Sequence, residues 1–195
     1  MELRSVEELM NLLHACRGVH DIPELTRSRP HPGGGTPAGV PVDLHDHALQ
    51  TAALLRRGHP SDKELQVAGL VHDIGHLLRP GADAGHADLA ADAVRPLLGE
   101  RVSGLVRLHV AAGRYLAAAP PGPGPSPRDT LAPDAAMTRH EAAAFEHDPL
   151  AEDAMTLWQA DDAGKVPGLY AGELEDWRTL LELVAERSAR LGAAD

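Results

Sequence analysis

Apolar residues recur at steps of three and four positions through most of this 195-residue chain, while alternating runs typical of β-strands are scarce. This periodicity predicts an all-α protein. The expected helices lie near residues 5–16, 43–57, 61–79, 86–98, 100–118, 138–147, 150–163 and 171–191.

Helix starts and loops punctuate this pattern. Three starts carry a capping box, in which a hydroxyl caps the helix and a Glu three residues later reaches back to it. These pairs are Ser5 with Glu8, Ser61 with Glu64, and Thr138 with Glu141. Residues 27–41 and 119–127 are too rich in Pro and Gly for a helix and are expected to be loops. The length is typical of one domain, so we expect a single domain over residues 1–195.

Charge and composition exclude several classes of partner. Lys and Arg number 18 against 29 Asp and Glu, for a net charge of −11, which opposes binding to a phosphate backbone. Cys16 is the only cysteine, which rules out an intramolecular disulfide. No apolar run reaches the 18 residues of a membrane span. We therefore expect a cytoplasmic protein that binds neither nucleic acid nor membranes; the sequence does not indicate its oligomeric state.

The stretch LVHDIGHLL, residues 70–78, places ionisable side chains inside an apolar run. An isolated His–Asp pair would more often satisfy itself in a core. Here, however, other predicted helices also carry metal-ligand residue types among apolar or small neighbours. The full set is His47, His72, Asp73, His86, His109 and Asp161. Imidazole and carboxylate suit Fe, Mn or Zn, and six donors exceed the needs of one catalytic ion, which favours two.

The order H…HD…H…H…D resembles that of the HD-domain metalloproteins over about residues 43–170. The strings HALQTA, VHDIGH, HVAAGRYL and DDAGKVPG are most similar to the mixed-valent diiron oxygenases that degrade organophosphonates, which are related to myo-inositol oxygenase. The resemblance implies an HD-domain helical bundle with the metal site at its centre. It also implies two Fe ions in the Fe(II)/Fe(III) state and O₂ as co-substrate.

The resemblance further divides the ligands between the two irons. One iron would be held by His47, His72, Asp73 and Asp161. The other would be held by Asp73, His86 and His109, so that Asp73 bridges the pair.

Other residues are candidates for contact with a substrate. The resemblance implies that His76 is catalytic and faces the substrate; the alternative is a histidine hydrogen-bonded to a ligand. Arg114, Lys165 and Trp158 are candidate substrate-binding residues, although each can instead pack, pair or be solvated. Gly113 and Trp158 stand where phosphonate-degrading relatives have Lys and Arg. We expect Gly113 to enlarge the pocket and Trp158 to supply an apolar wall or a face for a cation.

These features favour a diiron oxygenase that uses O₂ to cleave a C–P or C–C bond of a small hydroxylated substrate, for which a 1-hydroxy-organophosphonate is a candidate. The alternative is an HD-domain metal-dependent phosphohydrolase, in which two ions activate water and clamp a phosphate. The ligand count fits both. The strings around His47 and His109, and the lack of a Lys/Arg cluster for nucleotide phosphates, favour the oxygenase.

Overall fold

The computed structural model describes residues 1–20, 42–80, 85–118 and 137–192, and within these ranges the regular elements are helices, with no strand. They are α1 (Val6–Ala15), α3 (Leu44–Gly58), α4 (Lys63–Val71), α5 (Ile74–Leu78), α6 (His86–Ala118), α7 (Arg139–Glu146), α8 (Ala151–Ala163), a 3-10 helix (Leu174–Trp177) and α9 (Arg178–Gly192). The all-α prediction is confirmed. The loops expected at 27–41 and 119–127 lie outside the described residues.

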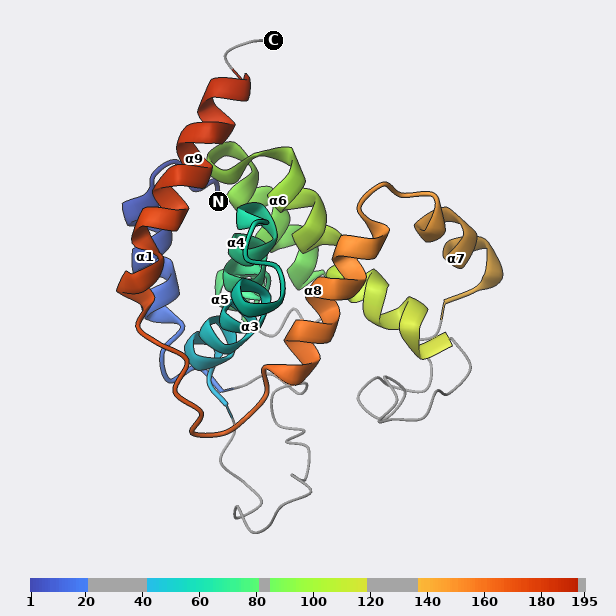
Figure 1. Ribbon diagram of the computed structural model, residues 1–195, viewed down its shortest axis with the longest axis horizontal. Helices are drawn as coiled ribbons and strands as arrows, with labels where there is room; N and C mark the ends of the chain where they lie inside the picture. Colours follow the sequence, from blue (N-terminus) through green and yellow to red (C-terminus); the bar gives the residue numbers. More distant parts are fainter. Residues whose placement is uncertain (21–41, 81–84, 119–136, 193–195) are drawn as a thin grey trace.

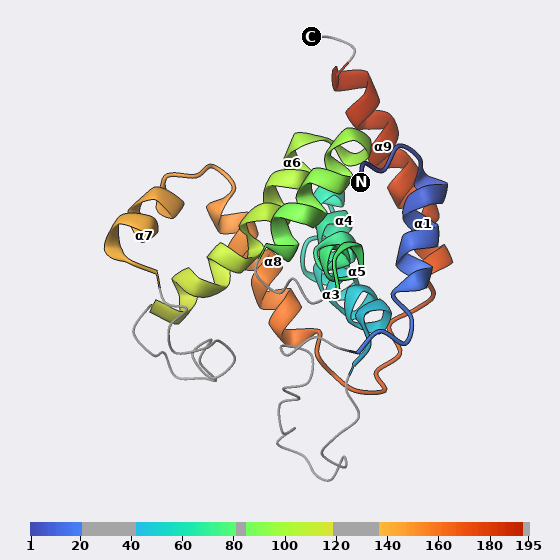
Figure 2. The same ribbon diagram turned by 180° about the vertical axis from the view of Figure 1, so that it is seen from behind.

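The helices surround a central pair (Figure 1). α3 and α4 lie in the middle, with α6 and α8 on one side and α1 and α9 on the other. Seen from behind, the second part of α6 extends away from the bundle toward α7 (Figure 2). The main core joins these layers through buried side chains such as Leu9, Leu55, Leu70, Val94 and Trp177. A smaller apolar cluster lies between the end of α6, α7 and α8.

The predicted helix over 61–79 is wrong in two respects. The cap of α4 is Asp62 rather than Ser61, because the Asp62 carboxylate accepts the Leu65 N–H at 3.0 Å. The helix also stops after Val71 and restarts at Ile74 as α5. At the break, the ring N–H of His72 donates to the Gly69 carbonyl at 2.9 Å, the carbonyl that would pair with the Asp73 main-chain N–H in a continuous helix.

The boundary expected between 98 and 100 is present as an interruption inside α6. Gly99 has φ 85° and ψ 178°, a conformation that favours glycine, so α6 changes direction there. The last predicted helix begins later than 171, since a 3-10 turn precedes α9. The capping boxes of Ser5 with Glu8 and of Thr138 with Glu141 are both formed.

Arg101 of α6 links this helix to the starts of α4 and α8. Its guanidinium donates to both oxygens of Asp62 at 2.8 and 2.7 Å and to Asp153 of α8 at 2.8 Å. It also contacts Glu64 at 3.3 Å. The network therefore fixes the start of α4 against α6 and α8.

In the part of the chain that the structure describes, no helix is both long and apolar enough to cross a membrane.

Candidate metal centre

Four parts of the bundle bring six ligand-type side chains to one buried place. α3 supplies His47, the break between α4 and α5 supplies His72 and Asp73, α6 supplies His86 and His109, and α8 supplies Asp161. Each of the five residues other than Asp73 is at most 8% exposed. The Asp73 side chain is 12% exposed. Two carboxylates so deeply buried require nearby positive charge.

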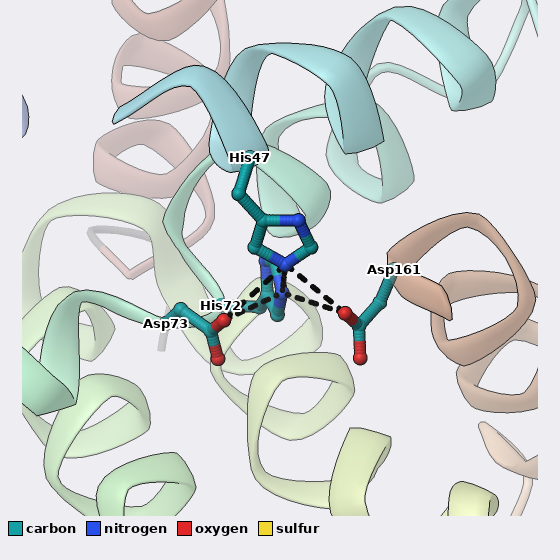
Figure 3. A group of neighbouring side chains, drawn as sticks. All are labelled: His47, His72, Asp73 and Asp161. Carbon is teal, nitrogen blue, oxygen red and sulfur yellow. Dashed lines mark hydrogen bonds and ion pairs between the residues drawn. The ribbon is translucent and has the colours of Figure 1, made fainter. Parts of the chain in front are cut away.

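The first donor group joins His47, His72, Asp73 and Asp161 (Figure 3). His47 Nε2 lies 3.2 Å from His72 Nε2, 3.3 Å from Asp73 Oδ2 and 3.0 Å from Asp161 Oδ1. His72 Nε2 lies 3.3 Å from the same Asp73 oxygen. Ligand atoms about 2.0 to 2.2 Å from one ion lie roughly 3 to 3.6 Å apart at octahedral or tetrahedral angles. The spacing therefore fits one ion.

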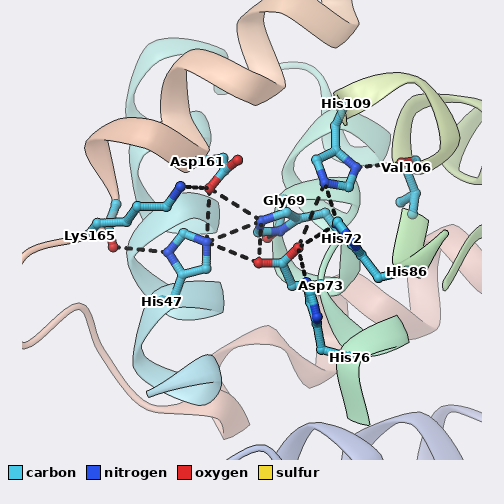
Figure 4. Close-up of polar contacts among 11 residues, drawn as sticks. His47, Gly69, His72, Asp73, His76, His86, Val106, His109, Asp161 and Lys165 are labelled. Atoms are coloured by element: carbon cyan, nitrogen blue, oxygen red, sulfur yellow. Dashed lines mark hydrogen bonds and ion pairs between the residues drawn. The ribbon is translucent and has the colours of Figure 1, made fainter. Parts of the chain in front are cut away.

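The second donor group joins Asp73, His86 and His109. Asp73 Oδ1 lies 3.5 Å from His86 Nε2 and 3.7 Å from His109 Nε2, and the two imidazole nitrogens are 3.3 Å apart. Asp73 therefore directs Oδ2 to the first group and Oδ1 to the second (Figure 4). This is the arrangement of a bridging carboxylate.

Backbone carbonyls orient three of the imidazoles. The Nδ1–H groups of His47, His72 and His109 donate to the carbonyls of Gly164, Gly69 and Val106, at 3.1, 2.9 and 2.6 Å. Since a carbonyl can only accept, these bonds place the proton on Nδ1 and direct the Nε2 lone pair to the centre.

Two such lone pairs, on His47 and His72, face each other at 3.2 Å. Without a metal ion, one of the two rings must also carry a proton on Nε2 to avoid repulsion, and a metal ion between the rings removes that need. The donor chemistry therefore fits a metal ion.

The charges of the centre lead to the same requirement. Burial alone raises the pKa of Asp73, but the charge of His72 and the hydrogen bond from His47 hold it well below its usual range. Burial lowers the pKa of His72, yet the charge of Asp73 and contacts with Asp161 raise it to about 10. His109 behaves oppositely: burial and the charge of His72 lower its pKa to about 4. The first group thus attracts positive charge strongly, whereas the imidazole of His109 is neutral.

Both cationic side chains among the candidate substrate-binding residues are paired with carboxylates. The Nζ of Lys165 lies 3.1 Å from Asp161 Oδ1, and its side chain is 13% exposed. Burial lowers the pKa of Lys165, but the charge of Asp161 outweighs this and raises it. Arg114 instead forms an ion pair at 3.1 Å with Glu141 of α7. The structure therefore brings Lys165 to the centre and places Arg114 in a contact with α7.

The expectation that Gly113 enlarges the pocket is wrong. A Cβ added to Gly113 would lie 2.2 Å from Nε1 and 2.6 Å from Cδ1 of Trp158. The indole therefore fills the space beside the glycine and packs directly on α6. Trp158 is buried in the smaller apolar cluster, with Ala112, Phe145 and Ala154. Gly113 and Trp158, the two positions that differ from phosphonate-degrading relatives, thus pack directly against each other.

His76 lies beside the second group without being part of it. Its ring stacks on that of His86 with centroids 4.0 Å apart, and its Nε2 is 4.0 Å from Asp73 Oδ1. This position is compatible with both alternatives for His76, contact with a substrate or support of a ligand.

Sequence reasoning missed the glycines that let backbone approach the centre. A Cβ on Gly69 would meet Leu55 at 2.5 Å, and one on Gly164 would meet Thr51 Oγ1 at 2.7 Å. A Cβ on Gly75 would lie 2.0 Å from the His86 carbonyl oxygen. For Gly75 and Gly164 the available signal was a glycine inside the strings VHDIGH and DDAGKVPG, whereas Gly69 lies in neither string.

Comparison with known proteins agrees with this geometry. The family model described as HD domain matches residues 44–146, and the chain belongs to the HD-domain family. The chain is 32% identical over 157 residues, 73% of its length and 78% of the relative's, to a hydroxymethylphosphonate dioxygenase of Gimesia maris. It is 30% identical over 141 residues, 65% of its length and 71% of the relative's, to a [1-hydroxy-2-(trimethylamino)ethyl]phosphonate dioxygenase (glycine-betaine-forming) of Leisingera caerulea. This is an HD-domain protein related to phosphonate dioxygenases.

Proposed function

We propose that this protein is a diiron oxygenase that uses O₂ to cleave the C–P bond of a small 1-hydroxyphosphonate. The observation that carries the proposal is Asp73, whose two oxygens face two separate groups of histidines. The names of both relatives support a 1-hydroxyphosphonate in particular, because each describes a dioxygenase acting on a phosphonate with a hydroxylated carbon.

The described residues divide the work of such a reaction. His47, His72, Asp73 and Asp161 would hold one iron, and Asp73, His86 and His109 the other. A mixed-valent Fe(II)/Fe(III) pair bound there would supply sites for O₂ and for the substrate hydroxyl, together with redox chemistry that side chains lack.

The remaining polar groups act on the substrate. Lys165 brings a buried positive charge beside Asp161, where it can face the anionic end of a substrate. His76, next to His86, is placed to hold or move a proton on the substrate. Trp158 closes the space between α6 and α8 with an apolar ring, which helps to keep water out.

The chemistry predicts defined products. Addition of one O₂ to a 1-hydroxyphosphonate and cleavage of its C–P bond give one phosphate and one carboxylate. A phosphohydrolase using the same ligands would release phosphate from a phosphate ester without consuming O₂.

The test is O₂ consumption by anaerobically purified protein. We expect about two irons per chain and a mixed-valent EPR signal. We also expect equal amounts of O₂ consumed and phosphate released with hydroxymethylphosphonate or [1-hydroxy-2-(trimethylamino)ethyl]phosphonate. A panel of diols, hydroxy acids, aminoethylphosphonates and phosphate esters serves as the comparison. Phosphate release from esters under anaerobic conditions, with no O₂ uptake on any phosphonate, would favour the hydrolase instead.

A variant of His76 separates its two roles. If His76 acts on the substrate, His76→Ala retains both irons and turns over about 100-fold or more slowly, a typical contribution of a positioned acid or base. If His76 only supports His86, the variant loses iron from that side. Iron content and kcat, measured on the same preparation, distinguish these results.

A further inference from the structure

The segment that follows α8 is tied to α3 by one buried glutamine. Gln50, which is 2% exposed, donates from Nε2 to the carbonyls of Val166 and Leu169 at 2.9 and 3.1 Å. Its Oε1 accepts the Val166 N–H at 3.0 Å. Both amide hydrogens and the carbonyl oxygen of Gln50 are therefore used on this one segment, which runs from α8 past the start of α3 toward α9 (Figure 1).

The tied segment contacts the metal centre twice. The Gly164 carbonyl accepts the Nδ1–H of His47 at 3.1 Å, and Lys165 pairs with Asp161 at 3.1 Å (Figure 4). Gln50 follows His47 by one turn of α3, so one helix face carries both a ligand and the clamp for the carbonyl that orients it.

The fit between the segment and α3 leaves little freedom. A Cβ on Gly164 would lie 2.7 Å from Thr51 Oγ1 and 3.1 Å from the Thr51 main-chain nitrogen. Gly164 has φ −80°, so glycine is required here for close approach rather than for its backbone conformation. A small displacement of the segment would therefore move the carbonyl away from His47.

We propose that Gln50 is a positioning residue of the metal centre. By fixing residues 164–169 against α3, it holds the Gly164 carbonyl on His47 and so sets the affinity for the ion bound by the first donor group. The inference rests on the metal centre of the proposed function but not on its reaction.

The test compares two buried glutamines. Gln50→Leu removes the clamp with little change in volume. Gln66→Leu is the matched control, because Gln66 is also buried and lies in the neighbouring helix α4. Its side chain donates to the His59 carbonyl at 2.7 Å, at the end of α3 far from the ligand His47. Each iron-loaded protein is exposed to increasing EDTA, and the iron retained per chain is measured after gel filtration.

We expect one iron of Gln50→Leu to be lost at a 10- to 100-fold lower EDTA concentration than in the unaltered protein, the usual effect of removing support from a ligand. The other iron should be lost at an unchanged concentration. Gln66→Leu should lose its irons at the same EDTA concentrations as the unaltered protein, even if its melting temperature falls as much as that of Gln50→Leu. Unchanged iron retention in Gln50→Leu, or equal losses in both variants, would overturn the inference.

Two further backgrounds assign the affected side. With His109→Ala, which leaves the first donor group intact, the shift caused by Gln50→Leu should persist. With Asp161→Ala, Gln50→Leu should add no further shift. The opposite pattern would contradict the assignment to the first group. An unaltered protein that binds no iron would overturn the proposed function together with the inference. Failure of the inference alone would leave the unaltered protein with both irons but would show no specific loss in Gln50→Leu relative to Gln66→Leu.

Discussion

Replacing Gly75 by Ala should damage the second donor group specifically. A Cβ at this position would lie 2.0 Å from the His86 carbonyl oxygen and 2.9 Å from its Cα. Ordinary contact begins at 3.4 Å, so the main chain at His86 must move by the difference, about 1.4 Å. Metal–ligand distances vary by only about 0.2 Å. His86 therefore cannot stay a ligand without strain elsewhere.

We expect Gly75→Ala to weaken iron binding on that side by about 100-fold or more, since a ligand itself is displaced. Overpacking should also lower the free energy of unfolding by about 1 to 3 kcal/mol. The measurements are iron per chain after gel filtration and urea unfolding of the metal-free protein.

Gly58→Ala is the matched control for this experiment. Gly58 is the last residue of α3 and a Cβ there meets nothing within 4 Å, so this variant should keep both irons. It should gain up to about 1 kcal/mol of stability, because Ala restricts the unfolded chain more than Gly. Two tightly bound irons and an unchanged EPR signal in Gly75→Ala would refute the reasoning from close approach.

Three further outcomes are expected. Asp73→Asn should lose both irons together, because a bridging carboxylate neutralises both ions, and undiminished iron would contradict the bridge. Burial raises the pKa of Asp62, but hydrogen bonds from Arg101 outweigh this and lower it. Asp62→Asn should therefore lower the free energy of unfolding by about 1 to 2 kcal/mol at pH 7. This difference from the unaltered protein should shrink below about pH 4, where Asp62 itself becomes protonated. A difference that stays constant in urea unfolding from about pH 3 to pH 7 would show that the charge is unimportant. Gly113→Ala should lower the free energy of unfolding by about 1 to 3 kcal/mol, and by much less in a protein that already carries Trp158→Leu. If the two losses simply add in the double variant, the indole is not the obstacle.

The helices and the candidate ligand residues could be predicted because both are visible as local patterns in the sequence. Periodicity finds an apolar helix face, and a histidine such as His47 or His109 on that face stands out. The break between α4 and α5 could not be found in this way. The His72 ring donates a hydrogen bond to the Gly69 carbonyl at this break, a contact that the apolar pattern does not reveal.

Contacts between distant segments explain the other differences. Gly113 reads as a missing side chain in the sequence, but the fold places the Trp158 ring in that space. Likewise, Gln50 lies within an ordinary helical pattern, and only the fold brings it to Val166 and Leu169. Single positions therefore indicated the chemistry of the centre, whereas its support comes from pairs that only tertiary structure joins.

The placement of the six ligand-type residues also has a consequence for folding. They come from α3, from the junction of α4 and α5, from α6 and from α8, so bound ions would cross-link elements that span most of the bundle. An ion that binds only the folded chain stabilises it by about 4.1 kcal/mol when its free concentration is 1,000 times the Kd. A substantial share of the resistance of this chain to unfolding would then depend on iron supply, and iron-starved cells would hold less of the folded protein as well as less of its activity.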